Sequence, residues 1–225
     1  MADRFEPVVE ALPERWAHQW NRSLEWMGLG MVFIPVGERL WNCYSSAGRF
    51  HHDPRHALAC VRALDDYPGV IANQDALELA LWFHDAAYCA QISARESRAT
   101  SAEMLRREFQ LLAGDLIDIE ETCRLITATR HHREPQGRDE ALAMDIDLLI
   151  LACEEWRYDI YAGEIRKEHN HVDEQTFRLQ RVEYLRTFMR RKSIYWTRHF
   201  RKLHEERAQS NIERELSALL SNPTQ

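Results

Sequence analysis

The chain contains very few residues that interrupt helices. Its 225 residues include only 8 glycines and 7 prolines, and no alternation of apolar and polar residues lasts long enough to predict a strand. Between these breakers, the apolar residues recur with the 3.6-residue period of an α-helix. We therefore predict a single all-α domain over residues 1–225, a helical bundle with a long C-terminal helical extension.

Several helices can be placed from their ends and their apolar pattern. In DPRHALACVRALDDY, Asp53 is a favourable N-cap and Pro54 suits the first helical position. VFIPV is compatible with an extended segment, although Pro35 disfavours a strand. ALAMDIDLLILACEEW, residues 141–156, is the most apolar stretch, and we expect it to form one central helix. Residues 196–220 are amphipathic and predict a long closing helix.

The charge balance and the cysteines limit the class of protein. A formal net charge of −7 argues against a broad nucleic-acid-binding surface. The 5 cysteines form no CxxC pair, which is typical of reduced thiols in the cytosol. The N-terminus is charged throughout, and no apolar run approaches the roughly 20 residues of a membrane span. These features predict a cytoplasmic protein that binds neither nucleic acid nor membrane, and they are compatible with a homodimer.

The stretch LALWFHDAAY places His84 and Asp85 side by side after an apolar run. Adjacent helical side chains point about 100° apart, so both reach one metal ion only if other ligands approach from neighbouring helices. His56, in the first turn after Asp53, is one such candidate. Asp147, in the apolar MDIDL stretch, is another, because an unpaired buried carboxylate is costly. For any single histidine, a core imidazole bonded to a backbone carbonyl is the alternative.

Three further polar residues lie close to these candidates in the sequence. Asp145 is about 200° around a helix from Asp147, so we do not expect both to bind one ion. Asp145 is instead expected to orient a ligand or to pair with an arginine. His131 and His132 end the stretch RLITATRHH, where the helix dipole alone favours histidine.

The ordered set of one histidine, a His-Asp pair and a later aspartate resembles the HD superfamily of metal-dependent phosphohydrolases, which are all-α domains. Over about residues 14–220, the chain is similar to an uncharacterised subfamily of predicted phosphohydrolases. RFHHDPRH, FHDAAY and DIDL resemble its Arg-x-Tyr-His-x-x-x-His, Phe-His-Asp-x-x-Tyr and Asp-Ala-Asp-Leu segments. YAGEIRKE and EERAQSNI resemble its C-terminal segments. The metal-site core would then span about residues 49–155, and the helical C-terminal part about 156–220.

Two positions depart from the pattern of this subfamily. In ESRATSA, Arg98 stands where an acidic residue is expected, and Glu96 would replace that acid by a two-residue shift. Gln209 stands where the closing segment has an arginine. Both departures bear on catalysis more than on the fold.

The resemblance implies hydrolysis of a nucleotide or another phosphorylated small molecule by a metal-bound hydroxide. Two imidazoles and two carboxylates suit a divalent ion such as Mn, Fe, Co, Ni or Zn, rather than Mg alone. The alternatives are a non-catalytic module that binds a metal and a nucleotide, and a di-iron oxygenase on the same scaffold. The expected metal ligands are His56, His84, Asp85 and Asp147. The candidate catalytic residues are Asp85, Glu96 and His131, and the candidate substrate-binding residues are Arg49, His52, Arg130, Asp145 and Arg166.

Overall fold

A computed structural model describes residues 12–113, 116–129 and 134–221 of the chain. Within these residues it contains ten α-helices, two short 3-10 helices and no strand. The prediction of an all-α fold is therefore confirmed.

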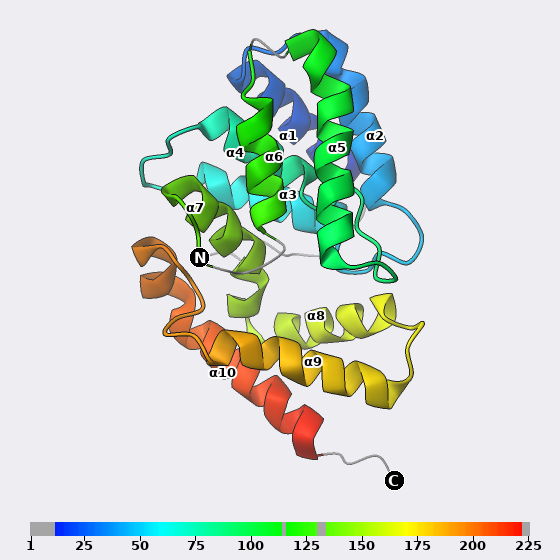
Figure 1. Cartoon of the computed structure of the whole chain (residues 1–225), viewed down its shortest axis with the longest axis vertical. Helices are drawn as coiled ribbons and strands as arrows, with labels where there is room; N and C mark the ends of the chain where they lie inside the picture. The colour runs from blue at the N-terminus through cyan, green and yellow to red at the C-terminus, as the bar shows by residue number, and fades with distance from the viewer. Residues whose placement is uncertain (1–11, 114–115, 130–133, 222–225) are drawn as a thin grey trace.

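The helices form an upper and a lower group when the molecule is viewed as in Figure 1. The upper group contains α1 (Leu12–Trp26), α2 (Ile34–Tyr44), α3 (Pro54–Asp65), α4 (Gln74–Phe83), α5 (Ala94–Ala113) and α6 (Ile119–Ala128). The lower group contains α8 (Glu155–Glu168), α9 (Glu174–Met189) and α10 (Arg198–Ser221). Between them lies α7 (Arg138–Asp147), and the 3-10 helices are η1 (Met31–Phe33) and η2 (Leu148–Ala152).

A continuous hydrophobic core connects the two groups, from Trp16 in α1 to Ile212 in α10. In the upper group, the Trp82 ring of α4 makes edge-to-face contacts with the rings of Trp16 and Trp20, at centroid distances of 4.7 and 5.3 Å. Such contacts add directional stabilisation to the burial of large apolar surfaces. The core thus fixes α4, which leads directly into the His-Asp pair, against the N-terminal helices.

The ends of α3 and α4 determine where the candidate ligands lie. Asp53 caps α3 as predicted, because its carboxylate accepts hydrogen bonds from the backbone N–H groups of Arg55 and His56. The Asn73 side chain caps α4 in the same way, and α4 ends at Phe83. His84 is therefore the C-cap of a buried helix; its N–H still bonds to the Ala80 carbonyl at 2.8 Å, and the chain leaves the helix after it.

The stretch 141–156 is not one helix, contrary to the prediction. It is divided among α7, the 3-10 helix η2 and the start of α8. Side chains from the C-terminal segment bond to the carbonyl groups that this break leaves free. The Tyr195 hydroxyl donates to the carbonyl of Leu148, and the Asn211 amide donates to those of Leu151 and Cys153. A stretch that is apolar on every side carries no periodic signal that could have shown this break.

The structure also decides the conformation of VFIPV and of the closing segment. VFIPV is not extended, since it covers the end of η1 and the start of α2, with Pro35 in the first turn of α2. The closing helix is confirmed as α10, which has 24 residues. Among the helices that the structure describes, none has the length and apolarity needed to cross a membrane.

Candidate metal centre

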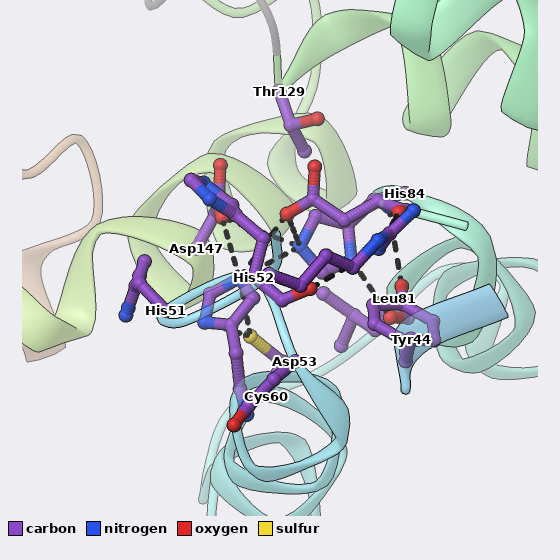
Figure 2. Close-up of polar contacts among 12 residues, drawn as sticks. Tyr44, His51, His52, Asp53, Cys60, Leu81, His84, Thr129 and Asp147 are labelled. Atoms are coloured by element: carbon purple, nitrogen blue, oxygen red, sulfur yellow. Dashed lines mark hydrogen bonds and ion pairs between the residues drawn. The ribbon is translucent and has the colours of Figure 1, made fainter. Parts of the chain in front are cut away.

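Four side chains from three helix ends meet in the interior. His56 belongs to the first turn of α3, His84 and Asp85 follow α4 directly, and Asp147 is the last residue of α7. We call these four residues the His–Asp cage, and Figure 2 shows the contacts around it. Because each residue sits where a helix begins or ends, side chains that would diverge along one helix converge from different directions.

The cage brings one ligand atom of each residue close to the other three. The Nε2 atoms of His56 and His84 are 3.0 Å apart. Asp85 Oδ2 is 3.4 Å from His56 Nε2 and 3.0 Å from His84 Nε2. Asp147 Oδ1 is 3.3 Å from both of these nitrogens. All four atoms lie within 4.8 Å of one another, so the cage could hold a metal ion.

The hydrogen bond made by His84 sets the state of its imidazole. Its Nδ1 lies 2.8 Å from the carbonyl oxygen of Leu81, which can only accept a hydrogen bond. Nδ1 therefore carries the proton and donates it, which leaves the lone pair of Nε2 directed into the cage. This arrangement, with the second ring nitrogen bonded to a carbonyl, is the usual one for a metal-binding histidine.

The carboxylate of Asp85 fits a bound cation. The residue is fully buried; its Oδ1 faces the guanidinium of Arg98, and its Oδ2 faces the Nε2 atoms of His56 and His84. A buried carboxylate is costly without positive charge nearby, so Oδ2 suits a cation held between it and the two imidazoles. The backbone of Asp85 is held in place by its own N–H, which donates to the Tyr44 hydroxyl at 3.2 Å.

The protonation of His56 and Asp147 shows how the cage behaves without an ion. Burial lowers the pKa of His56, but Cys60 and the hydrogen bond to Asp147 raise it well above its usual value. Burial raises the pKa of Asp147, but the facing imidazoles of His56 and His84 hold it well below its usual range. A raised pKa favours a proton on His56 beside the carboxylates, and a metal ion would compete with that proton.

Cys60 adds a soft ligand beside the cage that sequence reasoning missed. Its Sγ lies 3.9 Å from both ring nitrogens of His56, one turn further along α3. His56, Cys60 and His84 form a second group whose ligand atoms are close enough to hold a metal ion. The i, i+4 spacing of His56 and Cys60 was the available signal, because residues four apart share one face of a helix.

Arg98 of α5 lies against the carboxylates of the cage. Sequence reasoning did not place it there. It is buried, with its guanidinium against the carboxylate of Asp85 and 3.6 Å from Asp147 Oδ2. Its Nε donates to the Thr129 hydroxyl at 2.8 Å, and its Nη1 donates to the His84 carbonyl at 2.9 Å. The sequence had marked Arg98 only as a departure from an acidic pattern.

A cavity of about 300 Å³ opens beside the cage. It lies between the upper helices and the pair α8 and α9, and both Asp147 and Arg98 line it. Tyr88, Tyr161, Phe177 and other apolar side chains form much of its wall. This volume is at the lower end of the range for small-molecule sites, and an apolar wall with a few polar groups is typical of them.

His52 also lines the cavity and is held by a residue of α8. Its Nδ1 lies 2.7 Å from Oε2 of Glu168, while Oε1 of Glu168 accepts the backbone N–H groups of Phe50, His51 and His52. With Nδ1 bonded to Glu168, Nε2 is the nitrogen that His52 offers to a ligand. Glu168 was missed as a functional residue, although it ends the YAGEIRKE segment.

Two of the three arginines expected to bind substrate, Arg49 and Arg166, are bonded to the protein's own backbone. Arg49 donates to the carbonyl oxygens of His52, Asp85, Ala86 and Tyr88, at 2.7 to 3.1 Å. It therefore holds the loop after α4 against the loop before α3. The five N–H donors of its guanidinium suit such multiple bonding, and these bonds fix the backbone on either side of the cage.

Arg166 is similarly occupied at the end of α8. Its guanidinium bonds to the Glu174 carboxylate and to the carbonyls of His169 and Val172, and it stacks over the Phe177 ring. These contacts fix the turn between α8 and α9. Arg166 is not among the residues that line the cavity.

Asp145 of α7 lies outside the cage and faces the segment that precedes α10. Its two oxygens accept the backbone N–H groups of Trp196 and Thr197, both at 2.7 Å. Burial raises the pKa of Asp145 to about 6, against the lowering effect of these bonds. Gln209, further along α10, bonds to Glu205 one turn earlier and so stabilises the helix itself.

Glu96 is exposed at the start of α5 and is not part of the cage. Its carboxylate accepts the N–H and hydroxyl of Ser93, whose own hydroxyl oxygen accepts the Glu96 N–H. This reciprocal pair is a capping box, so the carboxylate of Glu96 stabilises the N-terminus of α5. Arg130 and His131 lie outside the described residues.

Comparisons with protein families, with curated proteins and with solved structures find no match to this chain. The functional argument therefore rests on the cage, the cavity and the charges around them. What these establish is a buried cluster of histidine and aspartate that could hold a metal ion.

Proposed function

We propose that the protein is a metal-dependent phosphohydrolase that acts on a nucleotide or another phosphorylated small molecule. The observation that carries the proposal is the position of the His–Asp cage at the wall of the cavity, where Asp147 belongs to both. An ion held by the cage would face a compartment large enough for a small molecule. The motif resemblance to the HD superfamily supports the same function.

The donor set favours a borderline divalent ion. Two imidazole nitrogens and two carboxylate oxygens suit Mn, Fe, Co, Ni or Zn better than Mg alone, and the nearby Cys60 thiol strengthens that preference. When bound, such an ion supplies Lewis acidity and lowers the pKa of a coordinated water towards neutrality.

The other residues of the cavity would bind and orient the substrate. His52 presents Nε2 as an acceptor to a hydroxyl group of the substrate, while Glu168 fixes the orientation of the ring. The aromatic rings of Tyr88 and Tyr161 provide an apolar surface for the organic part of the substrate. A planar group such as a nucleobase would bury the most surface there, which supports a nucleotide within the broader class.

A second candidate is a non-catalytic module that binds a metal and a nucleotide. The contact of Arg98 with Asp85 favours it, because an arginine already compensates part of the charge that would otherwise attract a metal ion. The two candidates share the cage and the cavity and differ only in turnover.

The test is phosphate release from a panel of phosphorylated small molecules, including nucleoside monophosphates, by the metal-free chain reloaded with Mn²⁺. Asp147→Asn should abolish release, with a loss of several orders of magnitude, because the cage loses a charged ligand. Asp145→Asn is the matched control on the same helix, and it should keep most activity, since Asp145 is bonded to the backbone of Trp196 and Thr197, outside the cage.

Three results would decide against the hydrolase. One is the absence of Mn²⁺-dependent release from every member of the panel, and another is equal activity in Asp147→Asn and the unaltered chain. Tight nucleotide binding without release would favour the non-catalytic module. Circular dichroism of both variants would show that each has folded.

A further inference from the structure

In each of the two cage carboxylates, one oxygen faces the histidines and the other faces an arginine. Asp85 Oδ2 and Asp147 Oδ1 face the imidazoles of His56 and His84. The second oxygens, Asp85 Oδ1 and Asp147 Oδ2, face the guanidinium of Arg98. One ion in the cage would therefore use the inner oxygens, and the outer oxygens would remain on Arg98.

The outer oxygens are the atoms that a second metal ion would need. In sites with two metal ions, the ions lie close together and share the substrate between them. A second ion beside this cage would have to displace the guanidinium or lie against it, and two cations in a buried site repel each other strongly. The position and the charge of Arg98 thus both oppose a second ion at these two oxygens.

Arg98 is fixed in this position by groups other than the carboxylates. Its bonds to the Thr129 hydroxyl and the His84 carbonyl connect it to α6 and to the end of α4, and it is only 7% exposed. An arginine with several fixed partners keeps one orientation, unlike a surface side chain that moves freely.

Arg98 also reaches the substrate compartment. The described residues that line the cavity include two arginines, Arg98 and Arg181. Arg181 is paired with Glu215 through two bonds, at 2.8 and 3.1 Å, whereas Arg98 faces the cage carboxylates. Arg98 is therefore the arginine that stands beside both the cage and the space where a phosphoryl group would enter.

We propose that Arg98 takes the place of a second metal ion, so that each chain binds a single ion in the cage and binds the phosphoryl group with the guanidinium. The second part rests on the proposed function. With one divalent ion and Arg98 against two carboxylates, the site carries a net positive charge. That charge suits an anionic phosphoryl group, and the planar guanidinium can bind two of its oxygens.

The first test is metal stoichiometry, which needs no enzymatic activity. The metal-free chain is titrated with Mn²⁺, and bound metal is measured by elemental analysis and electron paramagnetic resonance. We expect one Mn²⁺ per chain with no spin coupling between ions. Arg98→Glu should bind a second, spin-coupled Mn²⁺, because it replaces the competing cation with a further carboxylate. Arg98→Lys keeps the charge and should still bind one.

Two coupled ions in the unaltered chain would overturn this inference and leave the proposed function intact. A folded Arg98→Glu variant that binds one ion would also overturn it. If Arg98→Glu does not fold, the stoichiometry of the unaltered chain still decides the matter. A chain that binds no Mn²⁺ would overturn the inference and the proposed function together.

The second test is binding of inorganic phosphate to the Mn²⁺-loaded chain by calorimetry. Arg98→Gln should weaken binding about tenfold or more, because bonds to a charged donor are lost. Arg106→Gln is the matched control on the same helix, since that arginine is paired with Glu120 at the protein surface, and the phosphate affinity of this variant should not change. Equal phosphate affinity in Arg98→Gln and the unaltered chain would refute the phosphoryl role of Arg98.

Discussion

The Nε2 atoms of His56 and His84 lie 3.0 Å apart, although His56 is in the first turn of α3 and His84 directly follows α4. His84 donates its Nδ1 proton to the Leu81 carbonyl, so its Nε2 presents a lone pair to His56. Two imidazoles that face each other in this way need a proton or a cation between them. Burial lowers the pKa of His56, but Cys60 and Asp147 raise it above its usual value, which favours a proton between the two rings when no cation is bound.

Removal of the metal ion is therefore expected to destabilise the fold. At an ion concentration about 100 times the Kd, binding to the native state contributes about 2.7 kcal/mol. In a domain of this size, that corresponds to a fall in Tm of roughly 5–10 °C when a chelator is added. Calorimetry with and without chelator measures the difference, and added Mn²⁺ should restore it. An unchanged Tm in a chain that carried metal at purification would contradict this expectation.

The N-cap of α3 should matter for both stability and metal binding. Asp53→Ala removes the acceptor for the N–H groups of Arg55 and His56, and with it the ion pair to Arg55. The cap alone is worth about 1 kcal/mol. Because His56 belongs to this first turn, Mn²⁺ affinity should fall as well. Asp53→Asn keeps an acceptor and should lose less. Urea unfolding measures the stability and Mn²⁺ titration measures the affinity. Equal losses in Asp53→Ala and Asp53→Asn would show that the N-cap hydrogen bonds do not contribute.

The helices and their N-caps were accessible from the sequence because their signals are local. The start of α3 follows from Asp53 and Pro54, and the all-α fold follows from the period of the apolar residues. The break between α7 and η2 was not accessible, because it depends on Tyr195 and Asn211, which are distant in the sequence.

The candidate site was accessible to the extent that its residues are unusual where they stand. A His-Asp pair after an apolar helix and an aspartate in MDIDL are costly to bury alone, so the sequence itself pointed to them. Arg98 belongs to a polar helix, where arginine is ordinary, and only the packing of α5 shows that it is buried. Glu168 is likewise one of many acids, and its role depends on the loop that precedes α3.

The hydroxyl of Tyr44 should be important for the position of Asp85. It accepts the Asp85 N–H at 3.2 Å and donates to the Trp82 carbonyl at 3.0 Å. Tyr44→Phe leaves both buried backbone groups without a partner, which should cost about 1–3 kcal/mol in the free energy of unfolding. Mn²⁺ affinity should also fall, since Asp85 is less well fixed.

The matched control for Tyr44 is Tyr158→Phe, which removes a hydroxyl bonded to Glu215 away from the cage. This variant should lose stability without a change in Mn²⁺ affinity. Equal Mn²⁺ affinity in Tyr44→Phe and the unaltered chain would show that the hydroxyl does not position Asp85.

The pH dependence of stability should depend in part on Glu168. Burial raises its pKa, but His52 and the backbone N–H groups lower it to about 2 in the folded chain. A carboxylate with a lowered pKa stabilises the fold above its unfolded pKa and loses that contribution as the pH falls through the folded value. At pH 7 the shift corresponds to about 3 kcal/mol. Glu168→Gln should therefore be less stable in urea at pH 7, and the difference should shrink to less than half by pH 3. A difference that stays constant between these pH values would mean that the charge of Glu168 contributes nothing.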